Sequence, residues 1–154
     1  MSYNSKGNKK CAKQEPIKFE FVEKGYTDEK GNLREELITT EAQDIAKKLY
    51  NQGLSNSQLR AFFNEVKAIK SRINESEELF EKNYPFILML KSKAEYKYRN
   101  NGLKSKITKG FRDFINESVD YIKENKSLDT FENFVLFFEA IIGYFYGFGG
   151  GNNR

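Results

Sequence analysis

The sequence contains no histidine and no tryptophan, and only one cysteine and two prolines among its 154 residues. Without histidine the chain has no Ser-His-Asp triad, no Cys-His pair, no His-ligated zinc and no histidine general base. Cys11 stands alone in a polar segment, which excludes an internal disulfide and a thiolate metal cluster. These absences argue against catalysis, and we expect a protein that is not an enzyme and that holds no cofactor or metal.

Long apolar runs are also lacking. No uninterrupted run approaches the roughly 18 apolar residues of a membrane-spanning helix. The N-terminal stretch MSYNSKGNKKCAKQEP has lysines without an apolar core behind them, so it does not resemble a signal peptide. Together with the single cysteine, this pattern predicts a cytoplasmic protein without a membrane partner.

The composition is that of one ordinary domain. Hydrophobic residues make up 38% of the chain and charged residues 31%, and the 14 Phe and 9 Tyr are too many for a disordered chain. Residues 1–37 are rich in Lys, Glu, Asn and Gly, and we expect a flexible N-terminal arm there, in which IKFEFVEKGY could form a short strand or an extended docking segment. We place the folded domain at residues 38–148 and a flexible Gly-rich tail at 149–154.

Capping residues and apolar periodicity predict five helices. The first two cover about 40–52 and 56–75, each opened by a capping box, Thr40 with Gln43 and Ser55 with Gln58. The third spans about 76–100, and its Pro85 is expected to bend it or to start a new segment. The fourth spans about 105–125.

The fifth helix, FENFVLFFEAIIGYFYGF, is capped in this prediction by Asp129 with Glu132. Its residues are apolar at almost every angle around the axis, which is typical of the central helix of a bundle or of a helix shared with a partner. Five helices with short connections and no convincing sheet predict an all-α fold, a compact bundle with a flexible N-terminal arm.

The charges are unevenly distributed along the chain. Between residues 85 and 112 there are eight basic residues and one acid, Glu95, whereas residues 113–154 contain seven acids and three bases. On the second helix Arg60, Asn64 and Lys67 recur at helical spacing away from the apolar face. Lys93 and Lys97 repel each other at i and i+4 unless an anion lies between them.

This pattern suits a polyanion backbone that crosses two helices, because Lys and Arg contact phosphates while Asn hydrogen-bonds phosphate or sugar. The alternative is a solvated lysine-rich surface. The candidate RNA-binding residues are Arg60, Asn64, Lys67, Lys91, Lys93, Lys97, Arg99, Lys104 and Lys106.

Acidic residues on the fourth helix allow another interpretation. Asp113, Glu117, Asp120 and Glu124 lie on one side of it, and paired carboxylates can hold Mg²⁺ in a nuclease. Nothing else in the sequence completes such a site. A protein partner, or the basic face of a second copy of the chain, is a better use for this stripe.

Three stretches resemble the small helical subunit of type III-A CRISPR effector complexes, the Csm complex. SNSQLRAFFNEVKAI is similar to that family's Ser-x-Gln-Leu-Arg motif followed by two aromatics, and FILMLKSKAEYKYRN and FENFVLFFEAIIGYFYGFGG follow in the family's order. The resemblance covers about residues 39–150. Lys97 stands where the family is expected to have a small residue, and the N-terminal arm is long and variable in appearance, so nothing is carried over onto it.

The resemblance implies a subunit that is not a nuclease and that lines up in several copies beside guide RNA and target RNA. It would touch the RNA backbone in antiviral defence, with other Csm subunits and further copies of itself as partners. RNA cleavage would belong to neighbouring subunits, and DNA cleavage and cyclic oligoadenylate synthesis to the large subunit. Two alternatives stay open: a generic basic helical RNA- or DNA-binding module, and a protein-only adaptor bundle.

Overall fold

The computed structural model describes residues 16–99 and 107–149. Five long helices account for most of this part of the chain, together with the one-turn helix α2 and the π-helical turn η1 that leads into α3. In chain order the elements are α2 (Phe21–Lys24), η1 (Leu37–Glu41), α3 (Ala42–Asn51), α4 (Asn56–Ile73), α5 (Glu77–Tyr98), α6 (Lys109–Glu124) and α7 (Leu128–Gly149). The predicted all-α bundle is confirmed.

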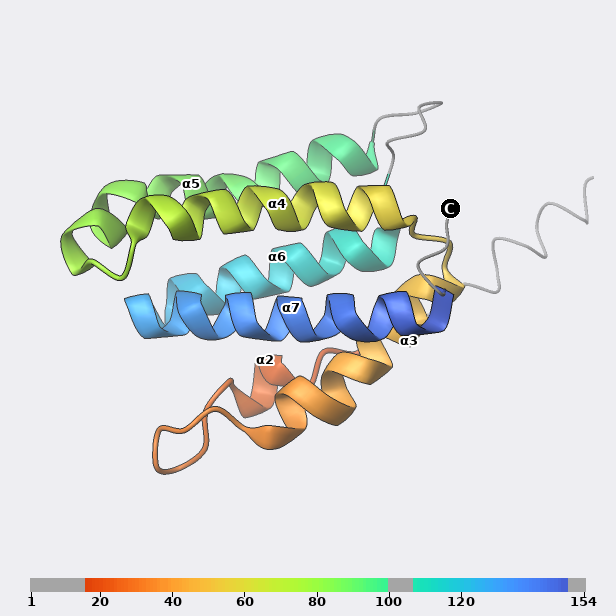
Figure 1. Ribbon diagram of the computed structural model, residues 1–154, viewed down its shortest axis with the longest axis horizontal. Coiled ribbons are helices and arrows are strands. Elements are labelled where there is room, and N and C mark those ends of the chain that lie inside the picture. The colour runs from red at the N-terminus through yellow and green to blue at the C-terminus, as the bar shows by residue number, and fades with distance from the viewer. Residues whose placement is uncertain (1–15, 100–106, 150–154) are drawn as a thin grey trace, which may run out of the picture.

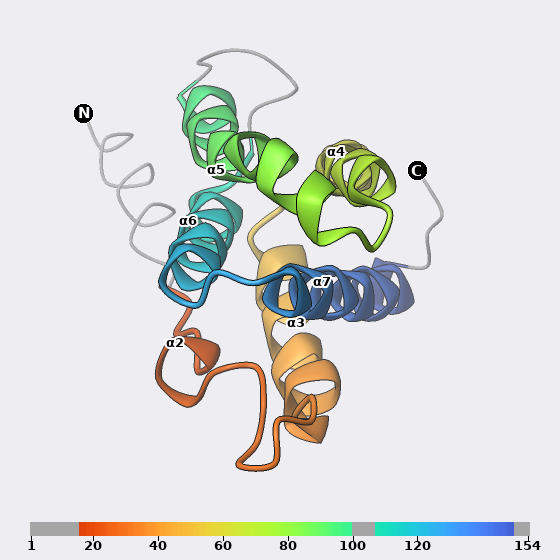
Figure 2. The same cartoon turned by 90° about the vertical axis from the view of Figure 1, so that its left-hand side faces the viewer.

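The helices stack in three tiers (Figures 1 and 2). α4 and α5 form an antiparallel pair on one side, α6 and α7 lie in the middle, and α2, the following loop and α3 cover the other side. α3 packs on α7, α5 packs on α6, and α4 contacts both α5 and α7. The outer surface of the α4–α5 pair is therefore turned away from the N-terminal part of the chain.

Helix α7 occupies the middle of the core. By length and composition it could span a membrane. Its apolar side chains are used inside the protein instead, because they pack against α3, α4, α6 and η1. The buried residues are Leu128, Phe131, Phe134, Val135, Phe137, Phe138, Ile141 and Phe145. This confirms the sequence-based expectation of a central helix.

The predicted caps had mixed outcomes. The box at Ser55 is confirmed, because its Oγ accepts from the Gln58 N–H at 3.1 Å while its own N–H donates to Gln58 Oε1 at 3.1 Å. The box at Thr40 is wrong, since η1 runs directly into α3 and Thr40 Oγ1 donates to a carbonyl one turn earlier. The cap at Asp129 is also wrong.

Helix α7 begins earlier than expected because Ser127 provides the cap. Its Oγ accepts from the Thr130 N–H at 3.0 Å. At Pro85 the predicted alternative of a new segment is wrong as well, because α5 is one helix from Glu77 to Tyr98. Pro85 lies on the exposed side of α5, where the carbonyl it leaves without a donor can bond water.

The N-terminal segment differs most from expectation. Residues 17–37 do not form a flexible arm, because Ile17, Phe19, Phe21, Tyr26 and Leu37 are buried in the core. Of the two alternatives for IKFEFVEKGY, the short strand is wrong, because Phe21–Lys24 is helical and the described residues contain only one isolated bridge, between Thr27 and Leu33. The segment instead docks on the bundle through its buried side chains. Residues 1–15 and 150–154, which the predicted arm and tail include, lie outside the described residues.

Aromatic contacts hold this segment in place. The Phe21 ring lies 5.5 Å from that of Phe137 on α7 and 6.0 Å from that of Tyr121 on α6. Tyr26 lies 4.3 Å from Tyr121 and donates its backbone N–H to the Tyr121 hydroxyl at 3.0 Å. Aromatic pairs at these separations add about 0.5–1.5 kcal/mol each beyond area burial. The segment is thus an integral part of the core.

A buried ion pair closes the same side of the molecule. Arg34 Nη1 lies 2.8 Å from Glu41 Oε2, and Arg34 Nε donates to the Gly25 carbonyl at 2.9 Å. Both side chains are about nine-tenths buried, and Arg34 Nη2 and Glu41 Oε1 have no hydrogen-bond partner among the described residues. The pair joins the N-terminal segment to η1 beside a polar cavity of about 710 Å³.

Candidate nucleic-acid interface

The outer surface of the α4–α5 pair is built on a defined helix register. The chain reverses between the two helices at Asn74 and Glu75, which both have a positive φ. On α4, Arg72 Nε donates to Asn83 Oδ1 at 3.3 Å and its guanidinium lies 5.1 Å from the centre of the Phe86 ring. Further along the pair, Glu65 on α4 forms an ion pair with Lys93 on α5. These contacts bring the start of α4 beside the end of α5.

The α4 candidates lie where the sequence places them. Leu59, Phe62 and Val66 are buried, and the opposite side carries the exposed residues Arg60, Asn64 and Lys67. Arg60 and Lys67 contact aromatic rings. Neither forms an ion pair with a described acid, so their charges are not compensated within the described part of the chain.

Arg60 reaches across to the last helix. Its Nε donates to the Tyr146 hydroxyl at 2.8 Å, and its guanidinium lies 5.1 Å from the centre of the Tyr146 ring. Lys67 Nζ lies 5.5 Å from the centre of the Phe63 ring. The two cations are therefore positioned on the surface without being neutralised.

The α5 candidates diverge to different sides of their helix. Lys93 turns toward α4 and pairs with Glu65, whereas Lys91 turns toward α6 and lies 2.7 Å from Asp120. Residues at positions i and i+2 of an α-helix point about 200° apart around its axis, so the two lysines cannot share a face. Lys97, one turn beyond Lys93, forms no ion pair with another described residue. Lys93 and Lys97 therefore lie on the side of α5 that faces α4, and Lys91 lies on the side that faces α6.

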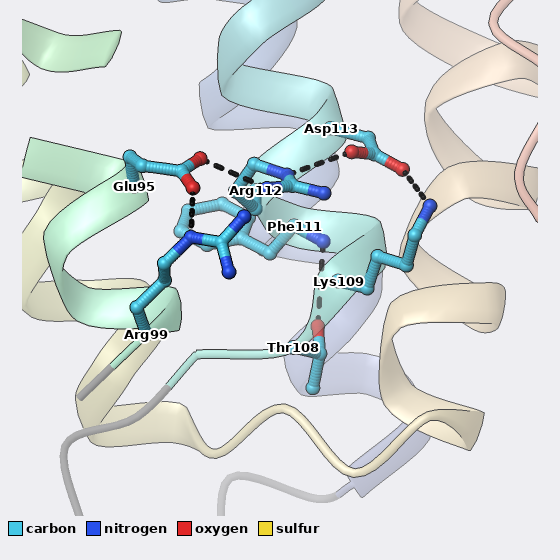
Figure 3. Close-up of polar contacts among 7 residues, drawn as sticks. All are labelled: Glu95, Arg99, Thr108, Lys109, Phe111, Arg112 and Asp113. Carbon is cyan, nitrogen blue, oxygen red and sulfur yellow. Dashed lines mark hydrogen bonds and ion pairs between the residues drawn. The ribbon is translucent and has the colours of Figure 1, made fainter. Parts of the chain in front are cut away.

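Arg99 belongs to a charge network between the ends of α5 and α6, shown in Figure 3. Glu95 accepts from Arg99 Nε and, at 2.8 Å, from Arg112 Nη1. Arg112 Nε donates to Asp113 at 2.9 Å, and Lys109 donates to the same carboxylate at 3.0 Å. Hydrogen bonds from Arg99 and Arg112 hold the pKa of Glu95 below its ordinary value. The network keeps Glu95 ionised and fixes the two helix ends.

Aromatic packing reinforces the network. The Arg112 guanidinium lies 4.4 Å from the centre of the Tyr98 ring, and only 15% of its side chain is exposed. Arg112 is therefore a structural cation, although it contributes to the basic run in the sequence. Lys104 and Lys106, two further candidates, lie outside the described residues.

The acidic stripe of α6 is largely consumed by ion pairs. Asp113 binds Arg112 and Lys109, and Asp120 binds Lys91. Within residues 16–99 and 107–149, no group of three or more His, Cys, Asp or Glu side chains could hold a metal ion. Asp113 and Asp120 thus act as partners of neighbouring bases, whereas Glu117 and Glu124 form no ion pair with another described residue.

Five of the nine candidates, here called the basic surface, lie on the α4–α5 pair in two groups: Arg60, Asn64 and Lys67 on the outer and α7-facing side of α4, and Lys93 and Lys97 on the side of α5 that faces α4. Sequence reasoning did not identify the acids that pair with the bases, Glu65 and Glu95. The Glu95–Arg99 pair has i, i+4 spacing and could have been found from the sequence. The pairing of Glu65 with Lys93 depends on the register of two helices, and no local signal reveals it.

Comparison with known families decides what kind of protein carries this surface. The model of the family described as Csm2 Type III-A matches residues 32–150, about three quarters of the chain. The chain belongs to the Csm2 family. Csm2 is the structural small subunit of the type III-A Csm complex, so the chain is a small subunit of a type III-A CRISPR complex and assembles with other Csm subunits. No curated protein and no solved structure matches the chain.

Membership confirms the resemblance carried by the three sequence motifs. Proteins of the Csm complex are generally cytoplasmic in bacteria and archaea. The matched region begins at residue 32, downstream of Phe19, Phe21 and Tyr26, so part of the core of this Csm2 protein lies before the region that defines its family.

Proposed function

We propose that this Csm2 protein is a non-catalytic, cytoplasmic subunit that lines the guide RNA and target RNA path in several copies during antiviral defence. It contacts the RNA backbone through the outer surface of α4 and α5. The proposal is supported by two neighbouring groups of cations on the α4–α5 pair, Arg60 with Lys67 on α4 and Lys93 with Lys97 on α5, of which only Lys93 is paired with a described acid. Asn64 adds a hydrogen-bonding group in the same row.

The geometry favours backbone contact over sequence readout. The surface offers cations and one amide in two rows, one along α4 and one along α5, and such groups suit phosphates and sugars. No described element forms a recognisable base-reading module. We expect weak binding of single-stranded RNA without sequence preference. With roughly four phosphate contacts, the logarithm of the affinity falls against the logarithm of the salt concentration with a slope of about −3.

The test compares two triple variants with the same loss of charge. Arg60→Ala/Lys67→Ala/Lys97→Ala removes unpaired cations from the proposed surface, and Lys18→Ala/Lys30→Ala/Lys47→Ala removes exposed lysines from the N-terminal part and α3. Lys93 is kept because its removal would leave Glu65 unpaired. The first variant is expected to bind RNA weakly, with a slope reduced to about −1, and the second to behave like the wild type. Equal losses in both variants would contradict a defined surface.

Two other functions give different outcomes. A generic RNA- or DNA-binding module would bind RNA through the same surface but would not co-purify in a Csm complex. A protein-only adaptor would co-purify in the complex and would retain its target RNA when the three cations are removed. Mass measurement of the purified Csm complex gives the number of copies of this chain that it contains.

A further inference from the structure

Tyr96 is the most exposed large hydrophobic side chain of the described residues. Its relative exposure is 69%, against 47% for Phe86 and 48% for Met89, which also lie on α5. No hydrogen bond, ring contact or cation–π contact involves Tyr96 within the described part of the chain. A single exposed aromatic is ordinary, so its surroundings decide whether it has a use.

Cations surround this ring without covering it. Lys93 and Arg99 lie one turn before and one turn after Tyr96 on α5, and Lys97 is the next residue. Lys93 is drawn toward α4 by Glu65, and Arg99 is drawn toward α6 by Glu95. The two ion pairs hold the flanking cations to either side of Tyr96.

Phe86 is an exposed aromatic on α5 that, unlike Tyr96, already has a partner. Its ring is turned toward α4, where the Arg72 guanidinium lies over it at 5.1 Å from the ring centre. Phe86 is therefore already partnered, and it lies nearer the turn between the helices than the basic surface does. Tyr96 is the exposed aromatic that remains open beside the cations of the proposed RNA surface.

The chemistry around Tyr96 favours a nucleobase over a protein side chain. The centres of protein interfaces are depleted in lysine, whereas two lysines, Lys93 and Lys97, lie within one turn of this ring. Single-stranded nucleic acids bind where aromatic rings stack with bases and nearby cations contact phosphates. We propose that Tyr96 stacks with an unpaired base of single-stranded RNA, while Lys93 and Lys97 contact the adjoining phosphates. This inference rests on the proposed RNA binding and assigns it a base contact that is independent of sequence.

The experiment separates stacking from charge. Tyr96→Leu keeps an apolar side chain but removes the ring, and it is expected to lower the affinity for an RNA oligonucleotide by roughly 5- to 100-fold with no change in salt slope. Tyr96→Phe is expected to bind like the wild type, since the ring is retained. Phe86→Leu is the matched control and should leave the affinity unchanged. Because Tyr96 is largely exposed, thermal unfolding should be unaltered in the two Tyr96 variants, and the loss of the Arg72 contact in Phe86→Leu should lower stability only slightly.

Two further measurements address the base directly. An abasic oligonucleotide has no ring to stack, so the difference between wild type and Tyr96→Leu should vanish with it. The chain has no Trp, which allows 2-aminopurine in the RNA to report stacking by quenching that is lost in Tyr96→Leu. RNA binding that is unaffected by Tyr96→Leu, or a loss that persists on abasic RNA, overturns the stacking role alone. A wild-type protein that binds no RNA overturns the proposed function as well.

Discussion

Lys93 on α5 and Glu65 on α4 form an ion pair across the surface that we assign to RNA. Both side chains are nearly half exposed, at 43% and 48%. An exposed pair of this kind contributes little to stability. Its larger effect is on the electrostatic potential of the surface, because the carboxylate partly cancels the charge of a lysine within reach of a phosphate.

Glu65→Gln is therefore expected to strengthen RNA binding. The substitution removes one negative charge from the surface and leaves Lys93 without a competing carboxylate, so the affinity should rise at each salt concentration while the slope stays at about −3. Glu23→Gln removes an exposed acid from the N-terminal part and serves as the control. Filter binding over a salt series measures both variants. Equal gains in the two would show that net charge, rather than Lys93, decides the affinity.

The purified protein is expected to cleave neither RNA nor DNA with Mg²⁺ or Mn²⁺. No described carboxylates group into a metal site, and Asp113 is already bonded to Arg112 and Lys109. End-labelled single-stranded RNA and DNA are incubated with the protein and separated by gel electrophoresis. Cleavage that disappears in Asp113→Ala or Glu117→Ala would make the protein a nuclease and contradict the proposal.

Stability should decline at alkaline pH through Tyr26, which is 1% exposed. Burial raises the pKa of Tyr26 well above its ordinary value of about 10. The unfolded chain loses this proton near pH 10 while the folded protein keeps it, so the contribution is complete below about pH 10 and falls above it by about 1.4 kcal/mol per pH unit.

Tyr26→Phe isolates this effect from the titration of the lysines. The Tyr26 hydroxyl has no hydrogen-bond partner among the described residues, so the variant should be as stable as the wild type near pH 7. Above pH 10 it should become the more stable protein. Urea unfolding at pH 7 and pH 10.5 provides the comparison, and parallel pH profiles for the two proteins would show that Tyr26 ionises as readily in the folded state.

The pair of Arg34 and Glu41 should be costly to break from one side. Arg34→Met leaves the Glu41 carboxylate buried without its cation, which costs about 3–5 kcal/mol. The double variant Arg34→Met/Glu41→Leu removes both charges and should recover much of that loss. Urea unfolding of the two single variants and the double variant gives the coupling. Additive losses would mean that the two charges do not interact.

Helix periodicity predicted the bundle well because the apolar residues of α4 to α7 recur over several turns. The N-terminal segment has too few turns for a periodic signal: Phe19, Phe21 and Tyr26 are single aromatics within a charged stretch. Their burial depends on the aromatic surface that α6 and α7 provide, which is remote in sequence. Local composition therefore predicted a flexible arm where tertiary contacts produce order.

The positions of the candidate interface residues were predictable from the sequence, but their ion pairs were not. The outward position of Arg60, Asn64 and Lys67 follows from the α4 periodicity alone. The separation of Lys91 from Lys93 also follows from helix geometry. Which bases are compensated does not follow, because Glu65 and Asp120 come from other helices. A run of like charges in a sequence thus overstates the charge that a folded surface presents.

The docking of the N-terminal segment also sets an order of events during synthesis. Tyr26 hydrogen-bonds a residue 95 positions further along the chain, and Phe21 packs on α7, the last helix. A ribosome that adds 5–20 residues per second needs on the order of ten seconds to make the intervening chain. During this interval Phe19, Phe21 and Tyr26 have no core to enter and are open to chaperones or to other nascent chains. The bundle can therefore be completed only after α7 has been synthesised, when Phe21 can pack on Phe137.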